Sequence, residues 1–122
     1  MAIIKPVLRI FDYQKAMEFY RDWLGFKVDW EHTFEENMPV YMQISREDLY
    51  LHLSEHYGDG TPGSGVFIDD FKGLKTYHQQ LTDKKYKYYR PGLEKAFWGE
   101  NLLYMVVQDP FGNKLTFCGP EE

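Results

Sequence analysis

The residues best suited to chemistry lie on one predicted strand, which reads Leu49-Tyr50-Leu51-His52-Leu53. Side chains alternate between the two faces of a strand, so Tyr50 and His52 share one face and the leucines the other. The leucines suit a face covered by a helix. Tyr50 and His52 then face a concave sheet surface, where a few polar groups are typical of a binding site. A histidine held by ordinary hydrogen bonds within the fold is the alternative interpretation.

The preceding strand extends the same surface. Tyr41 and Gln43 alternate with apolar residues, so we expect both side chains to share a face with His52. This pattern predicts a polar cluster on neighbouring strands.

A second candidate site lies in the loop between Pro91 and Asn101, where Trp98 precedes Gly99. Glycine permits a backbone that presents a bulky ring to a groove, so Trp98 is a candidate for ligand contact. Its alternative role is to cap the core or a dimer contact. Glu100 follows, and its carboxylate either meets a cationic ligand or is simply solvated.

Composition limits the possible partners. The chain has 122 residues, which fits one domain with a core of its own, and aromatic residues make up 18%. That share exceeds the needs of a small core, so some rings are expected to line a groove or an interface. The formal net charge of −5 argues against nucleic acid as a partner and favours a cationic ligand.

The cysteine content and the hydrophobic pattern bear on location. Cys118 is the only cysteine, which excludes an internal disulfide and indicates a reducing compartment, so we expect a cytoplasmic protein. No window approaches 18 consecutive apolar residues, so no membrane partner is expected. The first eleven residues are predicted to form a strand and not a signal peptide.

The candidate residues are positioned by two similar runs of elements. In the first run we expect strands at Ile3–Phe11, Phe26–Thr33, Val40–Ser45 and Leu49–Ser54, with a helix between Asp12 and Gly25. In the second run we expect strands at Gly65–Asp69, Lys85–Arg90, Leu102–Gln108 and Lys114–Cys118, with a helix at Phe71–Leu81.

These runs predict an internal repeat. One constant offset pairs Asp12 with Asp70 and Phe19 with Tyr77. We therefore predict an α+β fold, in which two βαβββ repeats form an open, cup-shaped mixed sheet. The whole chain, 1–122, is expected to be one domain, with repeat one at 1–56 and repeat two at 63–119.

The turn before the last strand has a clear mechanism. It reads Asp109-Pro110-Phe111-Gly112-Asn113. Proline presets φ at its position and glycine can take a positive φ, so the chain reverses here.

Several motifs combine into a resemblance that covers nearly the whole chain. They are Pro6-Val7-Leu8, Asp12, Ala16, Phe19-Tyr20 and Leu24-Gly25-Phe26, followed by the Asp109–Asn113 turn. In this order, and with the repeat, the chain resembles the glyoxalase / bleomycin-resistance / extradiol-dioxygenase (vicinal oxygen chelate) superfamily. Trp98-Gly99 before the turn is similar to the bleomycin-resistance branch.

The resemblance implies a homodimer in which the N-terminal strand is exchanged between subunits, with Pro6 near the hinge. It also implies that Trp98 stacks on a planar ligand. Phe34 would supply a second stacking ring from the partner subunit.

The enzymes of this superfamily hold a divalent metal with His and Glu on inward strands. The corresponding positions here are Lys5, His52, Gly63 and Thr116, of which only His52 could ligate a metal. This departure puts lactoylglutathione lyase, dioxygenase and thiol-transferase activities in doubt, and we expect neither metal nor cofactor.

Three hypotheses follow. The first is a metal-independent binding protein that sequesters a planar, cationic small molecule, such as a bleomycin-type antibiotic, in grooves at a dimer interface. The second is a metal-dependent glyoxalase-type lyase or dioxygenase on the same fold. The third is a structural or regulatory member without a ligand site.

Overall fold

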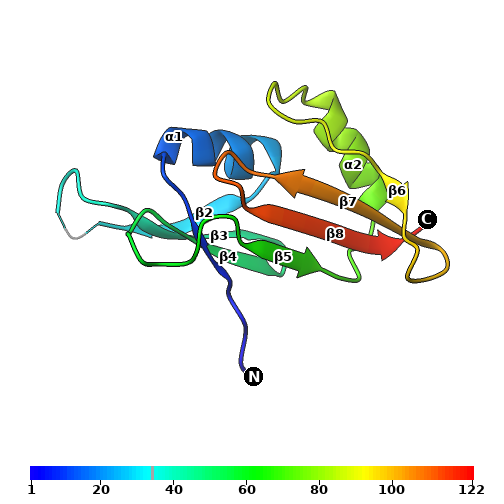
Figure 1. Ribbon diagram of the computed structural model, residues 1–122, viewed down its shortest axis with the longest axis horizontal. Coiled ribbons are helices and arrows are strands. Elements are labelled where there is room, and N and C mark those ends of the chain that lie inside the picture. Colours follow the sequence, from blue (N-terminus) through cyan, green and yellow to red (C-terminus); the bar gives the residue numbers. More distant parts are fainter. Residues whose placement is uncertain (34) are drawn as a thin grey trace. The chain divides into compact units, whose positions relative to one another are not determined.

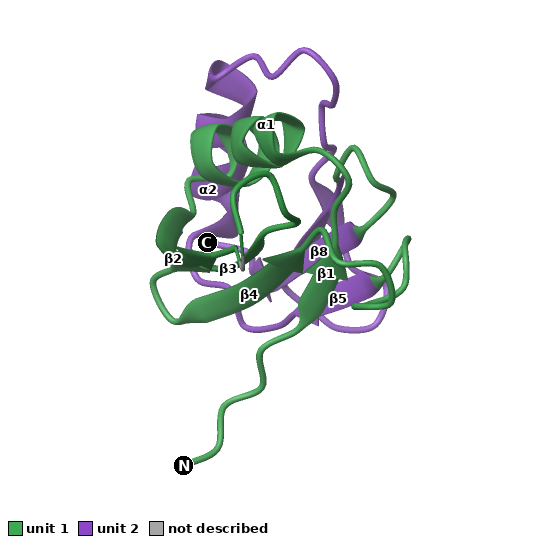
Figure 2. Cartoon of the chain, turned by 90° about the vertical axis from the view of Figure 1, so that its left-hand side faces the viewer, with its two compact units in different colours: residues 1–64, 109–113 green, residues 65–108, 114–122 purple. Residues whose placement is uncertain are grey.

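The structure is a computed structural model that describes residues 1–33 and 35–122. The chain divides into two compact units, drawn in two colours in Figure 2. Unit 1 contains Met1–Ser64 and Asp109–Asn113, and unit 2 contains Gly65–Gln108 and Lys114–Glu122. The prediction of one domain with repeats at 1–56 and 63–119 stays a prediction.

Unit 1 holds one helical segment and a four-stranded sheet. Its elements are β1 (Val7–Arg9), α1 (Tyr13–Ala16), η1 (Met17–Trp23), β2 (Lys27–His32), β3 (Tyr41–Arg46) and β4 (Leu49–Ser54). The strand order is β1-β4-β3-β2. Strand β1 runs parallel to β4, and the other pairs are antiparallel. The helical segment lies over one face of this sheet (Figures 1 and 2).

The helical segment begins and ends where the sequence indicates. Asp12 has extended backbone and its Oδ1 accepts a hydrogen bond from the Lys15 amide at 3.0 Å, which caps the helix. In η1 the backbone is wider than an α-helix, since the Leu24 amide donates to the Phe19 carbonyl five residues back, at 2.9 Å. Gly25 ends the helix with a φ of 85°.

Unit 2 repeats the strand order. Its elements are β5 (Gly65–Ile68), α2 (Leu74–Asp83), β6 (Glu94–Lys95), β7 (Leu102–Gln108) and β8 (Lys114–Pro120). The order β5-β8-β7-β6 again combines one parallel pair, β5 with β8, with antiparallel pairs. Helix α2 contacts β7 and β8 and buries Leu74, Tyr77 and Leu81. The predicted α+β class with mixed sheets is confirmed.

Two predicted strands differ from the structure. The strand expected at Lys85–Arg90 is wrong: this segment forms turns, because Lys85 has a φ of 54°, which breaks an extended chain. The strand that does pair with β7 is the short β6. The first strand is also shorter than predicted, and the N-terminal end of the chain extends away from the sheet (Figure 1).

The second helix begins later than predicted. It starts at Leu74 and its N-cap is Gly73, with a φ of 72° and no side-chain cap. Phe71, predicted to be helical, is buried outside the helix. The apolar spacing located the buried face but not the first turn.

The Asp109–Asn113 turn belongs to unit 1. Asp109 Oδ1 accepts from the amides of Phe111 and Asn113, and its Oδ2 accepts from the Tyr20 hydroxyl at 2.6 Å. Asn113 Nδ2 donates to the Arg9 carbonyl at 2.9 Å. Asp109 and Asn113 are both buried, so the turn is fixed to η1 and β1 by satisfied polar groups.

In the described part of the chain, no helix is long and apolar enough to cross a membrane. Cys118 is buried on β8, which fits a small packed residue.

Candidate functional site

Unit 1 brings four of the predicted residues together on one sheet face. The register of β3 and β4 pairs Gln43 with His52, Ser45 with Tyr50 and Tyr41 with Ser54. The buried side chains Leu51 and Leu53 lie on the opposite face. The placement of Tyr41, Gln43, Tyr50 and His52 on one surface therefore agrees with the alternation in the sequence.

These side chains belong to a hydrogen-bond network in which each donor and acceptor can be assigned. Lys5 Nζ can only donate, and it contacts Gln43 Oε1 at 2.8 Å. The Asp29 carboxylate can only accept, and its Oδ2 lies 3.0 Å from Gln43 Nε2. The Lys5 donor and the Asp29 acceptor therefore fix which side of the Gln43 amide is oxygen and which is nitrogen. Ser45 Oγ donates to the other Asp29 oxygen at 2.9 Å.

The fixed amide determines the tautomer of His52. Because Gln43 Oε1 is an acceptor, His52 Nε2, 3.0 Å away, must carry a proton. In the neutral ring Nδ1 is then the acceptor, and the Tyr41 hydroxyl donates to it at 2.7 Å. Burial, together with the Lys5 ammonium, lowers the pKa of His52, which favours this neutral form.

Other groups of the network titrate away from their usual ranges. Above all, the hydrogen bond from Gln43 lowers the pKa of Asp29, which keeps this carboxylate charged. Burial, and then the Asp59 carboxylate, raise the pKa of Tyr41, so its phenol stays protonated. The Lys5 ammonium also lies over the Tyr50 ring, 5.2 Å from its centroid.

Trp30 belongs to this face, and the sequence pattern did not identify it. Simple alternation along β2 places Trp30 on the same side as Val28, against the helix. Asp29 is an extra residue in a bulge, since Val28 pairs with Ile44 while Trp30 pairs with Gln43. The bulge moves Trp30 to the polar face, where it is 43% exposed.

The exposed ring of Trp30 is stacked on Tyr41. The two ring centroids are 6.0 Å apart and the planes differ by 13°. His52 meets both rings edge-on, at 5.4 Å from Trp30 and 5.2 Å from Tyr41. Such packing holds the indole in place while one side remains open to solvent.

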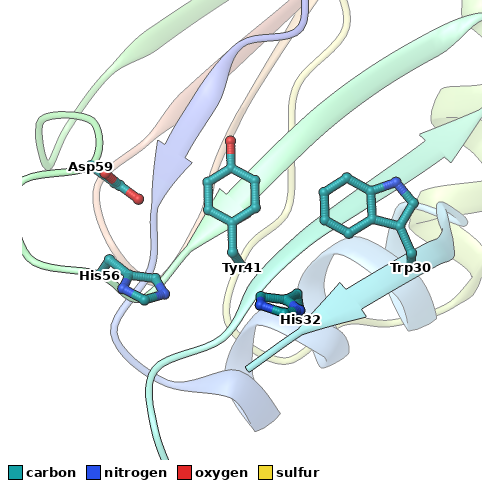
Figure 3. A pocket seen from close by; sticks show the side chains of 5 residues that line it. All are labelled: Trp30, His32, Tyr41, His56 and Asp59. Atoms are coloured by element: carbon teal, nitrogen blue, oxygen red, sulfur yellow. The ribbon is translucent and has the colours of Figure 1, made fainter. Parts of the chain in front are cut away.

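A pocket opens beside this stack. Its volume is about 370 Å³, and its walls are Trp30, His32, Tyr41, His56 and Asp59 (Figure 3). In the view of Figure 3, Tyr41 lies between Asp59 and Trp30. The pocket thus combines aromatic faces with a carboxylate and two imidazoles.

Unit 2 carries a different surface, which we call the aromatic cluster: Phe67, Phe97, Trp98 and Tyr104. Trp98 is its centre, with ring centroids 6.1 Å from Phe67, 5.0 Å from Phe97 and 5.1 Å from Tyr104. Trp98 is 44% exposed and Phe97 94%. An exposed group of aromatic rings is typical of a contact surface.

The structure also places the residues near Trp98 in the chain that were predicted to contribute to a site with it. Gly99 does not take a positive φ; a Cβ there would lie 2.5 Å from Leu102 Cδ1, so glycine leaves room for that side chain. Glu100 is exposed. The carboxylate that contacts the aromatic cluster is Glu94, which accepts from the Tyr104 hydroxyl at 2.8 Å. Phe34 lies outside the described residues.

The donor set of unit 1 does not fit the divalent metal of the superfamily enzymes. Both nitrogens of His52 are engaged, with Nε2 donating to Gln43 and Nδ1 accepting from Tyr41. The Lys5 ammonium shares the same Gln43 oxygen, so a cation already lies beside the imidazole. Across residues 1–33 and 35–122, no three His, Cys, Asp or Glu side chains are grouped so that they could hold a metal ion.

Comparisons with solved structures show the fold. A bleomycin-binding protein complexed with bleomycin is 22% identical, with a TM-score of 0.73, over 99% of this chain and 100% of that chain. The bleomycin resistance determinant encoded on transposon Tn5 is 20% identical, with a TM-score of 0.73, over 100% of both chains. TnmS3, an antibiotic binding protein from Streptomyces sp. CB03234, is 13% identical, with a TM-score of 0.66, over 98% of this chain and 97% of that chain.

The family is shown by sequence. A search of curated proteins found no significant match. A family profile described as "Glyoxalase superfamily protein" matches residues 1–122, the whole chain. The chain therefore belongs to the glyoxalase superfamily.

Proposed function

We propose that this protein binds and sequesters a planar, cationic small molecule without a metal and without chemistry. The observation that carries this proposal is the exposure of Trp98 at the centre of the aromatic cluster. A ring fixed by three aromatic neighbours, yet open on one side, suits the stacking of a flat ligand. Each aromatic contact would contribute about 0.5–1.5 kcal/mol beyond the burial of area.

Further support comes from unit 1 and from the charge of the chain. Trp30, stacked on Tyr41, offers a second open aromatic face. Phe34, which the family resemblance implies as a second stacking ring, stays a prediction. The net charge of −5 attracts cations, and among the structural neighbours are proteins that bind bleomycin or another antibiotic. We therefore include a bleomycin-type antibiotic among the ligands to be tested.

The proposal includes a homodimer whose interface grooves hold the ligand. Support comes from the N-terminal segment, in which Ile3 is 63% and Ile4 90% exposed. Exposed apolar residues ahead of a short edge strand suit exchange with a second copy, and Pro6 lies at the junction. We also propose a cytoplasmic location, because the single thiol is buried and no disulfide is required.

The first experiment combines metal analysis with a titration. We expect the purified protein to contain no stoichiometric metal, and metal-free bleomycin to quench its tryptophan fluorescence to saturation. Trp98→Ala should weaken binding by at least about tenfold, since one stacked ring is lost. Tyr88→Ala is the matched control, because Tyr88 is an exposed ring of unit 2 outside the aromatic cluster.

Two results would contradict the proposal. Stoichiometric zinc, nickel, manganese or iron would favour a metal-dependent lyase or dioxygenase instead. A saturable titration that Trp98→Ala leaves unchanged would show that the aromatic cluster is not the binding surface. The dimer is tested separately by light scattering, where a monomer at all concentrations would contradict the interface grooves.

A further inference from the structure

The pocket of unit 1 has one negatively charged wall. Asp59 is partly buried, and its Oδ2 accepts a hydrogen bond from Ser54 Oγ at 2.9 Å. Among the described residues, no lysine or arginine forms an ion pair with Asp59. A pocket carboxylate that is paired with neither lysine nor arginine is stabilised by a ligand that brings the positive charge.

Tyr41, next to Asp59 in the pocket wall, also presents an acceptor. Its only hydroxyl proton is donated to His52 Nδ1, because the Gln43 amide fixes the proton of His52 on Nε2. Toward the pocket the phenol oxygen therefore offers lone pairs and no proton. The hydrogen bonds among Gln43, His52 and Tyr41 thus determine which groups the pocket can recognise.

The aromatic walls of the pocket favour a flat cation. The stacked rings of Trp30 and Tyr41 present aromatic faces, and such faces attract cations as well as planar groups. An anion would meet the Asp59 carboxylate and the oxygen of Tyr41, and it would find no donor on either.

We propose that this pocket binds the cationic donor group of an aromatic ligand, such as an amidinium, guanidinium or ammonium carried on a flat ring. The cation donates hydrogen bonds to the Asp59 carboxylate and the Tyr41 oxygen, and the ring lies against Trp30. This inference rests on the proposed function, because it names the part of the ligand that unit 1 recognises.

The test compares two probes of the same shape on the full chain. Benzamidine is a planar cation, and benzamide is its neutral counterpart. We follow the indole N–H resonance of Trp30 by NMR, assigned with Trp30→Phe. Benzamidine should shift this resonance to saturation and bind at least about tenfold more tightly than benzamide, because only the cation forms a charge-assisted bond with Asp59.

Two variants test whether Asp59 causes the preference for benzamidine over benzamide. Asp59→Asn keeps an acceptor for Ser54 but removes the charge, so benzamidine should lose its advantage. Asp48→Asn makes the same change of charge in the exposed turn at the other end of the β3–β4 hairpin, and the advantage should persist. Equal binding of the two probes to the unmodified protein, or a preference that survives Asp59→Asn, would overturn the inference.

The two proposals fail in different ways. If benzamidine is selected through Asp59 but bleomycin produces no quenching, the pocket assignment stands and the sequestration of that drug class does not. If bleomycin binds through Trp98 while both probes bind equally, sequestration stands and the cation pocket is wrong.

Discussion

Unit 1 and unit 2 have the same strand order, yet their helices begin in different ways. Asp12 caps the first helix with its carboxylate. Asp70, its counterpart in the second run, has a φ of 55° and pairs with Lys72 at 2.7 Å. Helix α2 begins only after Gly73. The same residue type at matching positions therefore has two roles, because the local backbone determines what a side chain can reach.

The open sheet faces differ as well. In unit 1, Lys5 and His52 belong to a connected polar network. In unit 2 the position matching His52 is Thr116, whose strand neighbour is Phe67 of the aromatic cluster. One strand arrangement thus supports a polar surface in one unit and an apolar, stacking surface in the other.

The largest expected effect concerns the turn that belongs to unit 1. Asp109→Ala removes the acceptor for the Tyr20 hydroxyl, for the Asn113 side-chain amide and for the backbone amides of Phe111 and Asn113, most of which are buried. The free energy of unfolding should fall by at least about 3 kcal/mol, as expected for several unsatisfied buried groups. Asp69→Ala, an exposed position of unit 2, should change it by less than about 0.5 kcal/mol in the same denaturant titration. Equal losses of unfolding free energy in the two variants would mean that the hydrogen bonds of Asp109 do not stabilise unit 1.

A smaller effect separates the two helix starts. Asp12→Ala should destabilise the protein by about 1 kcal/mol, the usual cost of losing an N-cap. Asp70→Gly should cost less than about 0.5 kcal/mol, since it removes an exposed ion pair and glycine accepts a positive φ. Thermal unfolding of both variants checks the contrast. Similar losses would show that Asp70 supports α2 in a way its geometry does not indicate.

The smallest expected effect is a change in the pKa of His52. Lys5→Met should raise the pKa of His52 toward the ordinary value of 6.5, because it removes the ammonium that disfavours a second positive charge. The change is partial, since burial is the larger cause. NMR of the imidazole protons measures it, with Lys75→Met, a surface lysine of α2, as the control.

The same pKa has a consequence for stability. A histidine whose folded pKa is lowered contributes stability that is fully present above 6.5 and is lost as pH falls through the folded pKa. Lys5→Met should therefore weaken the loss of stability on mild acidification. An unchanged acid transition, together with an unchanged pKa, would mean that Lys5 does not act on His52.

Local rules account for the features that the sequence predicted. Alternation in β3 and β4 is uninterrupted, so the shared face of Tyr41 and His52 could be predicted. Gly25 and Gly112 both take a positive φ, as a helix end and a turn require. Each of these features depends on residues close together in the chain.

The missed features depend on irregular backbone. The bulge at Asp29 reverses the alternation, so the sequence pattern did not identify Trp30 as part of the polar face; the acidic residue inside this strand was the one available signal. The tyrosines after Lys85 favour a strand by composition, but that residue has left-handed backbone. The direction of the His52 hydrogen bonds depends on side chains from β2, β3 and β4 and on Lys5, which precedes β1. No local sequence pattern brings these residues together.

The hydrogen bonds of the Asp109–Asn113 turn have a consequence for the order of folding. Tyr20 is 89 positions from Asp109, and Arg9 is 104 positions from Asn113. Closing loops of this length is slow, and contacts of high sequence separation delay folding. During synthesis, these hydrogen bonds can form only after the last hairpin has left the ribosome. Until then the Tyr20 hydroxyl lacks the Asp109 carboxylate as its partner.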